Sequence, residues 1–107
     1  MIDLAEVTAR LWANKEAKGF NTTSIDREFN FAYAELAEAF EAYRNGDKAE
    51  FGKELADVML FVLSLAKFQG VDMEAEIRAK LERNEQRQYI KRGDFNLDKD
   101  KLGKENK

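Results

Sequence analysis

The stretch from Glu35 to Leu63, ELAEAFEAYRNGDKAEFGKELADVMLFVL, decides the fold of this chain. It contains two runs of helix-forming residues, separated by the turn-forming sequence NGD. Each run carries two acids three residues apart, Glu35 with Glu38 and Glu54 with Asp57. Because the connection is very short, the two helices should pack as antiparallel neighbours. The pattern therefore predicts a helical hairpin with an acidic pair on each arm.

The composition of the whole chain agrees with a small helical protein and narrows its chemistry. The 107 residues suit a single domain, and the absence of proline favours helices with short connections. Without cysteine or histidine, the chain cannot form a thiolate zinc site, a Ser-His-Asp triad or a Glu-x-x-His di-iron centre. Any bound metal must be held by oxygen ligands, which favours Mg²⁺, Mn²⁺ or Ca²⁺. The net charge of -3 does not indicate binding to a nucleic-acid polymer.

Glycines at positions 19, 46, 70 and 93 divide the chain into segments of similar length. Glycine commonly ends a helix because it adopts the left-handed conformation of a C-cap without strain. Asp3 with Glu6, and Asp47 with Glu50, have the spacing of a capping box, and Asp72 marks a third helix start. For the remaining helix, three residues can accept hydrogen bonds from the first N–H groups: Thr22, Thr23 and Ser24. We expect helices over residues 3–18, 24–45, 47–69 and 72–91.

These four helices place the chain in the all-α class, as a four-helix bundle over residues 1–93. Residues 94–107 are polar, and we expect them to form a C-terminal tail. Large apolar residues form a stripe along the second helix, at steps of four and three: Phe29, Tyr33, Leu36, Phe40 and Tyr43. One chain of this size leaves such a surface uncovered, so we expect the bundle to be completed by homodimerisation, with a tetramer as the alternative.

The sequence indicates a cytoplasmic protein with no membrane partner. Its longest apolar run, VMLFVLSLA, is about half as long as a membrane-spanning helix. The first residues, MIDLAEVTARLW, include acids and lack the apolar core of a signal peptide.

The two acidic pairs form a candidate metal site. Residues three apart on a helix project about 60° apart and lie about 4.5 Å apart along the axis, so each pair can point at one place. Antiparallel packing of the two helices would bring Glu35 and Glu38 close to Glu54 and Asp57. Four converging carboxylates repel one another unless a divalent cation lies among them. We therefore predict a Mg²⁺ site, which Mn²⁺ can also occupy.

Two other interpretations of these acids remain open on the residues alone. Acids three apart on a helix often face solvent, although these share their helix faces with apolar residues such as Phe31 and Phe61. The acids can also form salt bridges, for which Lys53, Lys80 and Arg87 are the candidate partners.

The spacing of the four acids, with fifteen residues between Glu38 and Glu54, resembles the signature of the MazG-like all-α nucleoside triphosphate pyrophosphohydrolases. In the fourth expected helix, the motif Lys80-x-x-x-Asn84-x-x-Arg87-x-Tyr89 is similar to the closing motif of the small dCTP-pyrophosphatase-like members. The sequence KGFN at residues 18–21 is similar to bacterial and phage members, and the resemblance covers roughly residues 10–90. Two departures are Ala34, where many members have a further acid, and the lack of histidine.

The resemblance implies a Mg²⁺-dependent enzyme that hydrolyses a (deoxy)nucleoside triphosphate to the monophosphate and pyrophosphate, in housecleaning of the nucleotide pool. Carried over to this chain, it implies metal ligation by Glu35, Glu38, Glu54 and Asp57. One glutamate would act as general base, for which Glu38 and Glu41 are the candidates.

The resemblance also implies a set of substrate-binding residues. Lys80, Asn84 and Arg87 share a face of the fourth helix and suit phosphate oxygens or a base edge. Lys18, together with Lys15, offers positive charge from the first helix. The aromatic residues Phe20 and Trp12 are candidates for stacking on a nucleobase, with ordinary core packing as the alternative. The competing function is a non-catalytic helical interaction or nucleotide-sensing module.

Overall fold

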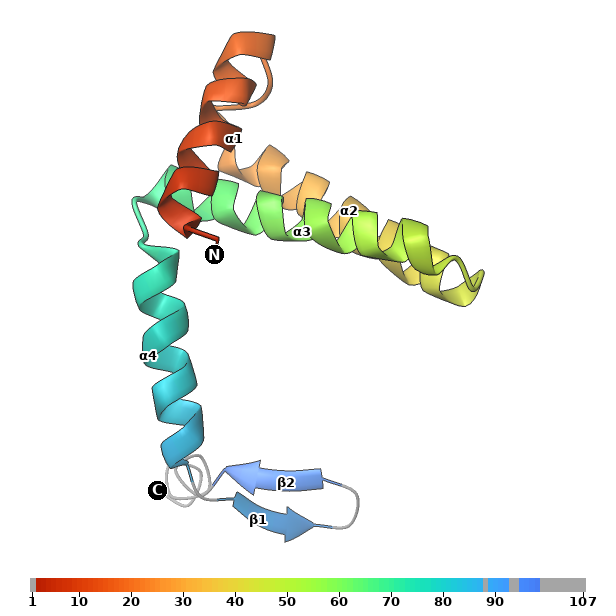
Figure 1. Cartoon of the computed structure of the whole chain (residues 1–107), viewed down its shortest axis with the longest axis vertical. Helices are drawn as coiled ribbons and strands as arrows, with labels where there is room; N and C mark the ends of the chain where they lie inside the picture. Colours follow the sequence, from red (N-terminus) through yellow and green to blue (C-terminus); the bar gives the residue numbers. More distant parts are fainter. Residues whose placement is uncertain (1, 88, 93–94, 99–107) are drawn as a thin grey trace. The chain divides into compact units, whose positions relative to one another are not determined.

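A computed structural model shows four helices followed by a two-stranded hairpin (Figure 1). The elements are α1 (Leu4–Lys18), α2 (Ile25–Arg44), α3 (Lys48–Gln69), α4 (Met73–Gln86), β1 (Tyr89–Arg92) and β2 (Phe95–Asp98). The structure describes residues 2–87, and the backbone alone of 89–92 and 95–98. Contacts divide the chain into two compact units, Met1–Glu74 and Ala75–Lys107. The predicted all-α class with four helices is confirmed.

The first three helices begin and end close to their predicted bounds, and local capping explains why. Carboxylate oxygens of Asp3 and Asp47 accept hydrogen bonds from Ala5 N (2.9 Å) and Glu50 N (3.1 Å). The Ser24 hydroxyl accepts one from Arg27 N at 3.2 Å. These bonds satisfy N–H groups that have no partner within the helix. At the other end, α1 and α3 stop at glycines 19 and 70, whose φ angles of 68° and 66° lie in the left-handed region.

Helices α2 and α3 form an antiparallel pair, as the short connection predicts (Figure 1). Three contacts define their alignment: the hydrogen bond between Glu28 and Ser64, and the ring pairs Phe31–Phe61 and Tyr43–Phe51, with centroids 6.0 and 6.2 Å apart. The residue numbers rise along α2 as they fall along α3, which requires opposite directions. The buried apolar side chains of the described core are small except for one leucine: Ala39, Ala42, Leu63 and Ala66.

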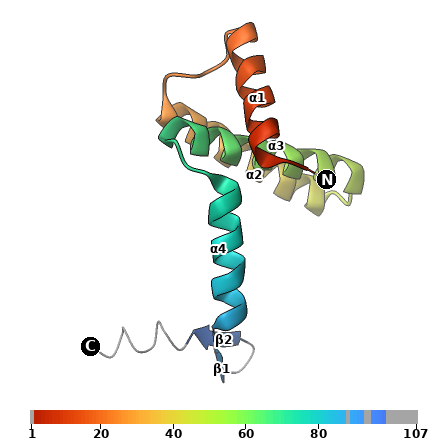
Figure 2. The same cartoon turned by 60° about the vertical axis from the view of Figure 1, so that its left-hand side comes forward.

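Helix α1 packs against the C-terminal half of α3. The ring of Trp12 meets that of Phe68 edge to face, with centroids 5.2 Å apart. Figures 1 and 2 show α1 crossing the α2–α3 pair at a steep angle. The loop after α1 leads back to the start of α2, where the Lys15 side chain reaches Glu28.

The apolar stripe of α2 is exposed in the single chain. Its five large residues, Phe29, Tyr33, Leu36, Phe40 and Tyr43, are between 41% and 67% exposed. On α3, Met59 and Leu60 are also exposed. Homodimerisation, which would cover such a surface, stays a prediction.

Helix α4 ends at Gln86, so the prediction that the fourth helix runs to residue 91 is wrong. The last hydrogen bond of α4 runs from Arg87 N to Arg83 O at 3.0 Å, and residues 89–92 then pair with 95–98 as antiparallel strands. The first strand reads YIKR, and its tyrosine and isoleucine favour extended backbone. The second strand occupies part of the predicted tail. Residues 93–94 and 99–107 lie outside the described residues, so the domain boundary between 93 and 94 stays a prediction.

Within the part of the chain that the structure describes, no helix is both long and apolar enough to span a lipid bilayer.

Candidate metal centre and adjoining hollow

Three of the four predicted acids converge between α2 and α3. Glu35 and Glu38 lie on successive turns of α2, and Glu54 faces them from α3. One carboxylate oxygen from each lies within 4.8 Å of the other two. These three residues are called the acidic cluster below. Their convergence follows from the antiparallel packing and from the spacing of acids three residues apart.

Two oxygens of the acidic cluster are buried without a hydrogen-bond partner. One belongs to Glu35 and one to Glu54. Ionised carboxylates accept hydrogen bonds but cannot donate them, so the two groups cannot satisfy each other. Burying a charged oxygen without a partner is costly. A proton or a cation is therefore needed between these two side chains.

The electrostatics of Glu54 show the same need. Its contact with the Glu35 carboxyl, followed by burial and by the nearby Glu50 and Glu38 carboxyls, raises the pKa of Glu54 from 4.5 to about 8. Each of these causes disfavours the ionised form of Glu54. A divalent cation would reverse this preference, because its charge stabilises the carboxylate and displaces the proton.

The donor set suits a hard divalent cation. All donors are carboxylate oxygens, which Mg²⁺ and Mn²⁺ prefer, and the Glu38 side chain is exposed to solvent. The salt-bridge interpretation receives no support from Lys53, which forms no ion pair with the acidic cluster among the described residues. The acidic cluster thus fits a divalent cation.

Asp57 lies outside the acidic cluster. It is exposed on α3, one turn beyond Glu54, and lines a hollow of about 220 Å³ together with Phe20 and Lys15. Its role as a metal ligand stays a prediction. Glu41 lies on α2 in a different hollow, beside Arg44, and its role as a base also stays a prediction.

Glu50 belongs to the surroundings of the acidic cluster, a role that sequence reasoning did not predict. It lies on α3 one turn before Glu54 and contributes to the raised pKa of that side chain. The spacing of four residues between them is the signal that could have indicated it.

An aromatic hollow adjoins the start of α2. Phe20, Phe31 and Phe61 line a space of about 340 Å³, and Phe20 remains 55% exposed. The structure therefore brings Phe20 into one hollow with residues of α2 and α3, the helices that carry the acidic cluster. Trp12 has the packing contact with Phe68 that the sequence left open as its alternative role. Lys18 is exposed in the last turn of α1.

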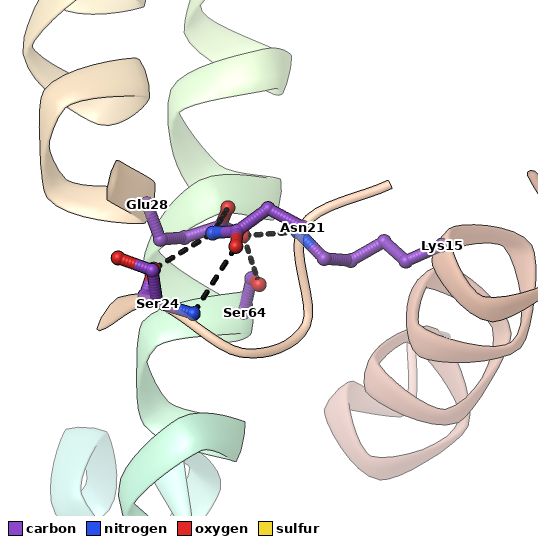
Figure 3. Close-up of polar contacts among 5 residues, drawn as sticks. All are labelled: Lys15, Asn21, Ser24, Glu28 and Ser64. Carbon is purple, nitrogen blue, oxygen red and sulfur yellow. Dashed lines mark hydrogen bonds and ion pairs between the residues drawn. The ribbon is translucent and has the colours of Figure 1, made fainter. Parts of the chain in front are cut away.

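A buried polar network lies beside this hollow, and sequence reasoning did not predict it (Figure 3). Glu28, completely buried, accepts hydrogen bonds from Lys15 Nζ and Ser64 Oγ, and one from Asn21 Nδ2 at 3.2 Å. Asn21 also bonds to the backbone of Ser24, which holds the loop between α1 and α2. Lys15, expected to offer positive charge to substrate, is instead buried and paired with Glu28.

Sequence spacing contained a signal for this network. Glu28 lies seven residues before Glu35 on α2, and Ser64 lies seven residues after Asp57 on α3. Residues seven apart share a helix face, so both belong to the stripes that carry the acids.

The predicted phosphate-binding residues lie in the second unit, Lys80 and Asn84 on α4 and Arg87 directly after it. Lys80 and Asn84 are exposed, and Arg87 donates a hydrogen bond from Nη1 to Asn84 Oδ1 at 3.1 Å. This contact shows that Asn84 and Arg87 share a face, as their spacing indicates. Their role towards substrate stays a prediction.

Comparison with protein-family models gives a match to the MazG-like family over residues 24–100. No curated protein and no solved structure matched the chain. The matched residues include α2 and α3, and therefore the whole acidic cluster. Membership of this family suggests an activity of the nucleotide pyrophosphohydrolase type, which is typically metal-dependent. With most of its length covered by this match, the chain belongs to the MazG-like family.

Proposed function

We propose that the protein hydrolyses a (deoxy)nucleoside triphosphate to the monophosphate and pyrophosphate, with Mg²⁺ or Mn²⁺ as the cofactor, and so removes unwanted nucleotides from the pool. The observation that carries this proposal is the convergence of Glu35, Glu38 and Glu54 within 4.8 Å, with two buried oxygens that lack partners. The match to the MazG-like family supports the reaction class.

The acidic cluster, with Asp57 as a further candidate, would hold the cation. A bound divalent cation neutralises triphosphate charge and polarises the phosphorus that is attacked. Rigid helices α2 and α3 set the positions of the carboxylates before substrate arrives, which favours the geometry of the reaction.

A carboxylate of α2 would act as general base. Water attacks the α-phosphorus, its proton passes to the base, and the bond from that phosphorus to the bridging oxygen breaks to release pyrophosphate. Glu38 is the better candidate because it belongs to the acidic cluster and is exposed. Glu41 is the alternative, and lies one turn further along α2.

The rest of the substrate would be bound outside the acidic cluster. The aromatic hollow of Phe20, Phe31 and Phe61 offers ring faces and apolar contact to a nucleobase. Lys80, Asn84 and Arg87 would bind phosphate oxygens or a base edge. The homodimer belongs to the same proposal, because the exposed stripe of α2 offers an apolar surface for a second chain.

The test is a panel of nucleoside and deoxynucleoside triphosphates, assayed for pyrophosphate release with Mg²⁺, with Mn²⁺ and with a chelator. We expect metal-dependent release that Glu54→Gln lowers at least a hundredfold, since the substitution removes a ligand. Glu16→Gln removes an equal charge from an exposed position of α1 and should leave the rate unchanged.

Three results would contradict part of this proposal. If Glu54→Gln retains the full rate, the acidic cluster is not the active site. If no triphosphate is hydrolysed but one binds tightly with metal, the protein is a nucleotide-sensing module; if none binds, a non-catalytic interaction module is the better account.

A further inference from the structure

We infer that the buried hydrogen bond between Glu28 and Ser64 sets the axial alignment of α2 against α3, and that Glu28 and Ser64 are therefore positioning residues for the acidic cluster. The inference rests on the proposed function only in treating the acidic cluster as a metal site. It assigns a role to a network that the proposed reaction does not use (Figure 3).

The alignment of the two helices connects the network to the acidic cluster. Phe31 lies three residues after Glu28 on α2. Its ring partner Phe61 lies three residues before Ser64 on α3. In the same way, Glu38 lies ten residues after Glu28 on α2, and Glu54 lies ten residues before Ser64 on α3. The hydrogen bond, the ring pair and the acidic cluster thus belong to one alignment.

When all three of its carboxylates are ionised, the acidic cluster opposes this alignment in the absence of a cation. Its three carboxylates lie within 4.8 Å of one another, and like charges at such distances repel. Sliding one helix by a single turn, about 5.4 Å, in the direction that brings Val58 opposite Glu35 and Glu38 would separate Glu54 from them and relieve the repulsion, whereas the opposite slide would bring Glu50 there. Another interaction must therefore favour the observed alignment.

The fully buried apolar side chains of the interface select poorly among alignments, while the partly exposed ring pairs Phe31–Phe61 and Tyr43–Phe51 follow the observed one. The buried residues are mostly alanines, and small side chains offer neighbouring turns nearly equal packing. Glu28, by contrast, is wholly buried and needs donors for its oxygens. A slide by one turn would replace Ser64 with Leu60 or Phe68, and neither side chain can donate a hydrogen bond.

Lys15 gives this contact its strength. Its ammonium group pairs with the same Glu28 oxygen that accepts the hydrogen bond from the Ser64 hydroxyl, and charge-assisted contacts of this kind are stronger than neutral ones. Asn21 binds the other oxygen at 3.2 Å. Buried polar contacts of this kind are known to specify helix register in other systems.

The experiment measures helix alignment and metal binding separately in the full chain. Because the sequence has no cysteine, spin labels can be attached to cysteines placed at Asp26 on α2 and Lys53 on α3, both exposed. In the observed alignment these positions are about 20 Å apart along the helix axes, and a one-turn slide changes this by about 5 Å. Dilution with unlabelled protein restricts the measurement to distances within one chain. Mn²⁺ affinity is measured on the unlabelled variants by calorimetry.

We expect Ser64→Ala to broaden or shift the distance distribution, and to weaken Mn²⁺ binding by about tenfold to a hundredfold. Ser64→Thr keeps the hydroxyl and should restore both properties. Ala66→Gly weakens α3 through helix propensity but removes no hydrogen bond, so it should lower thermal stability and change neither readout.

An unchanged distance distribution in Ser64→Ala would overturn the inference, whether or not the protein binds Mn²⁺. A changed distribution with unchanged Mn²⁺ affinity would overturn the link to the acidic cluster. If the wild type binds no Mn²⁺ while Ser64→Ala alters the distance, the alignment role stands and the proposed metal site fails. Glu28→Gln combined with Lys15→Met removes the charged pair together, and should alter the distance as Ser64→Ala does.

Discussion

Glu35 and Glu54 meet across the α2–α3 pair with one buried oxygen each and no hydrogen-bond donor between them. This contact is the main reason why the pKa of Glu54 rises from 4.5 to about 8. At neutral pH and without metal, Glu54 is thus mostly protonated. Binding of a cation to the acidic cluster should therefore displace the proton of Glu54, and the proton released can be measured.

Binding of Mn²⁺ at pH 7 should release most of one proton per cation from Glu54, because a group with a pKa of about 8 is largely protonated at that pH. Calorimetric titrations in two buffers that differ in ionisation enthalpy would measure the release. The observed heats should differ between buffers in the wild type and agree in Glu54→Gln. Equal heats in both buffers for the wild type would show that Glu54 is already ionised.

In the metal-free protein, the contribution of Glu54 to the free energy of unfolding should fall as the pH rises from about 4.5 to about 8. The folded state has the higher pKa and therefore binds more protons than the unfolded state in this window, so a rise in pH favours unfolding. Thermal unfolding of the wild type and Glu54→Gln across this range would isolate the contribution. We expect Glu54→Gln to be the more stable protein at pH 8, with the difference shrinking towards pH 4.5. A constant difference would contradict the raised pKa.

Glu38→Gln should lower kcat for pyrophosphate release at least a hundredfold, because it removes a member of the acidic cluster that is exposed and can accept a proton. Glu41→Gln should lower kcat less than about tenfold, since Glu41 lies outside the acidic cluster. Steady-state kinetics of both variants at saturating metal would compare them. A larger loss in Glu41→Gln would assign the base to Glu41.

Phe40→Glu should convert a homodimer into a monomer, because it places a charge in the exposed apolar stripe of α2. Light scattering coupled to size-exclusion chromatography would measure the mass against the 12.3 kDa of one chain. Glu16→Lys, which changes charge at an exposed position of α1, serves as the control and should stay dimeric. A wild type that is monomeric at high concentration would contradict the prediction.

Most of the helical fold could be predicted because its signals are local. Acceptors such as Asp47 begin a helix and glycines such as Gly70 end one through contacts within a few residues, so the sequence displays both directly. The antiparallel packing of α2 and α3 follows from their short connection. The end of α4 was missed because strand pairing of residues 89–92 depends on partners beyond the helix pattern.

The site was predictable to the extent that helix periodicity determines it. The spacing of Glu35, Glu38 and Glu54 brings them together once the helices are antiparallel. Asp57 has the same spacing from Glu54 as Glu38 has from Glu35, but it lies one turn further along α3, and the structure places it with Phe20 in the lining of a hollow instead. Glu28 was missed because a buried carboxylate looks like any surface acid until the residues facing it are known.

The most direct test of the central claim is anomalous X-ray scattering from Mn²⁺ in crystals of the protein bound to a non-hydrolysable nucleoside triphosphate analogue. We predict an anomalous peak from a Mn²⁺ ion that is coordinated by oxygens of Glu35, Glu38 and Glu54 and is in contact with the triphosphate. A triphosphate bound with Mn²⁺ elsewhere, and no peak at these three carboxylates, would contradict the account.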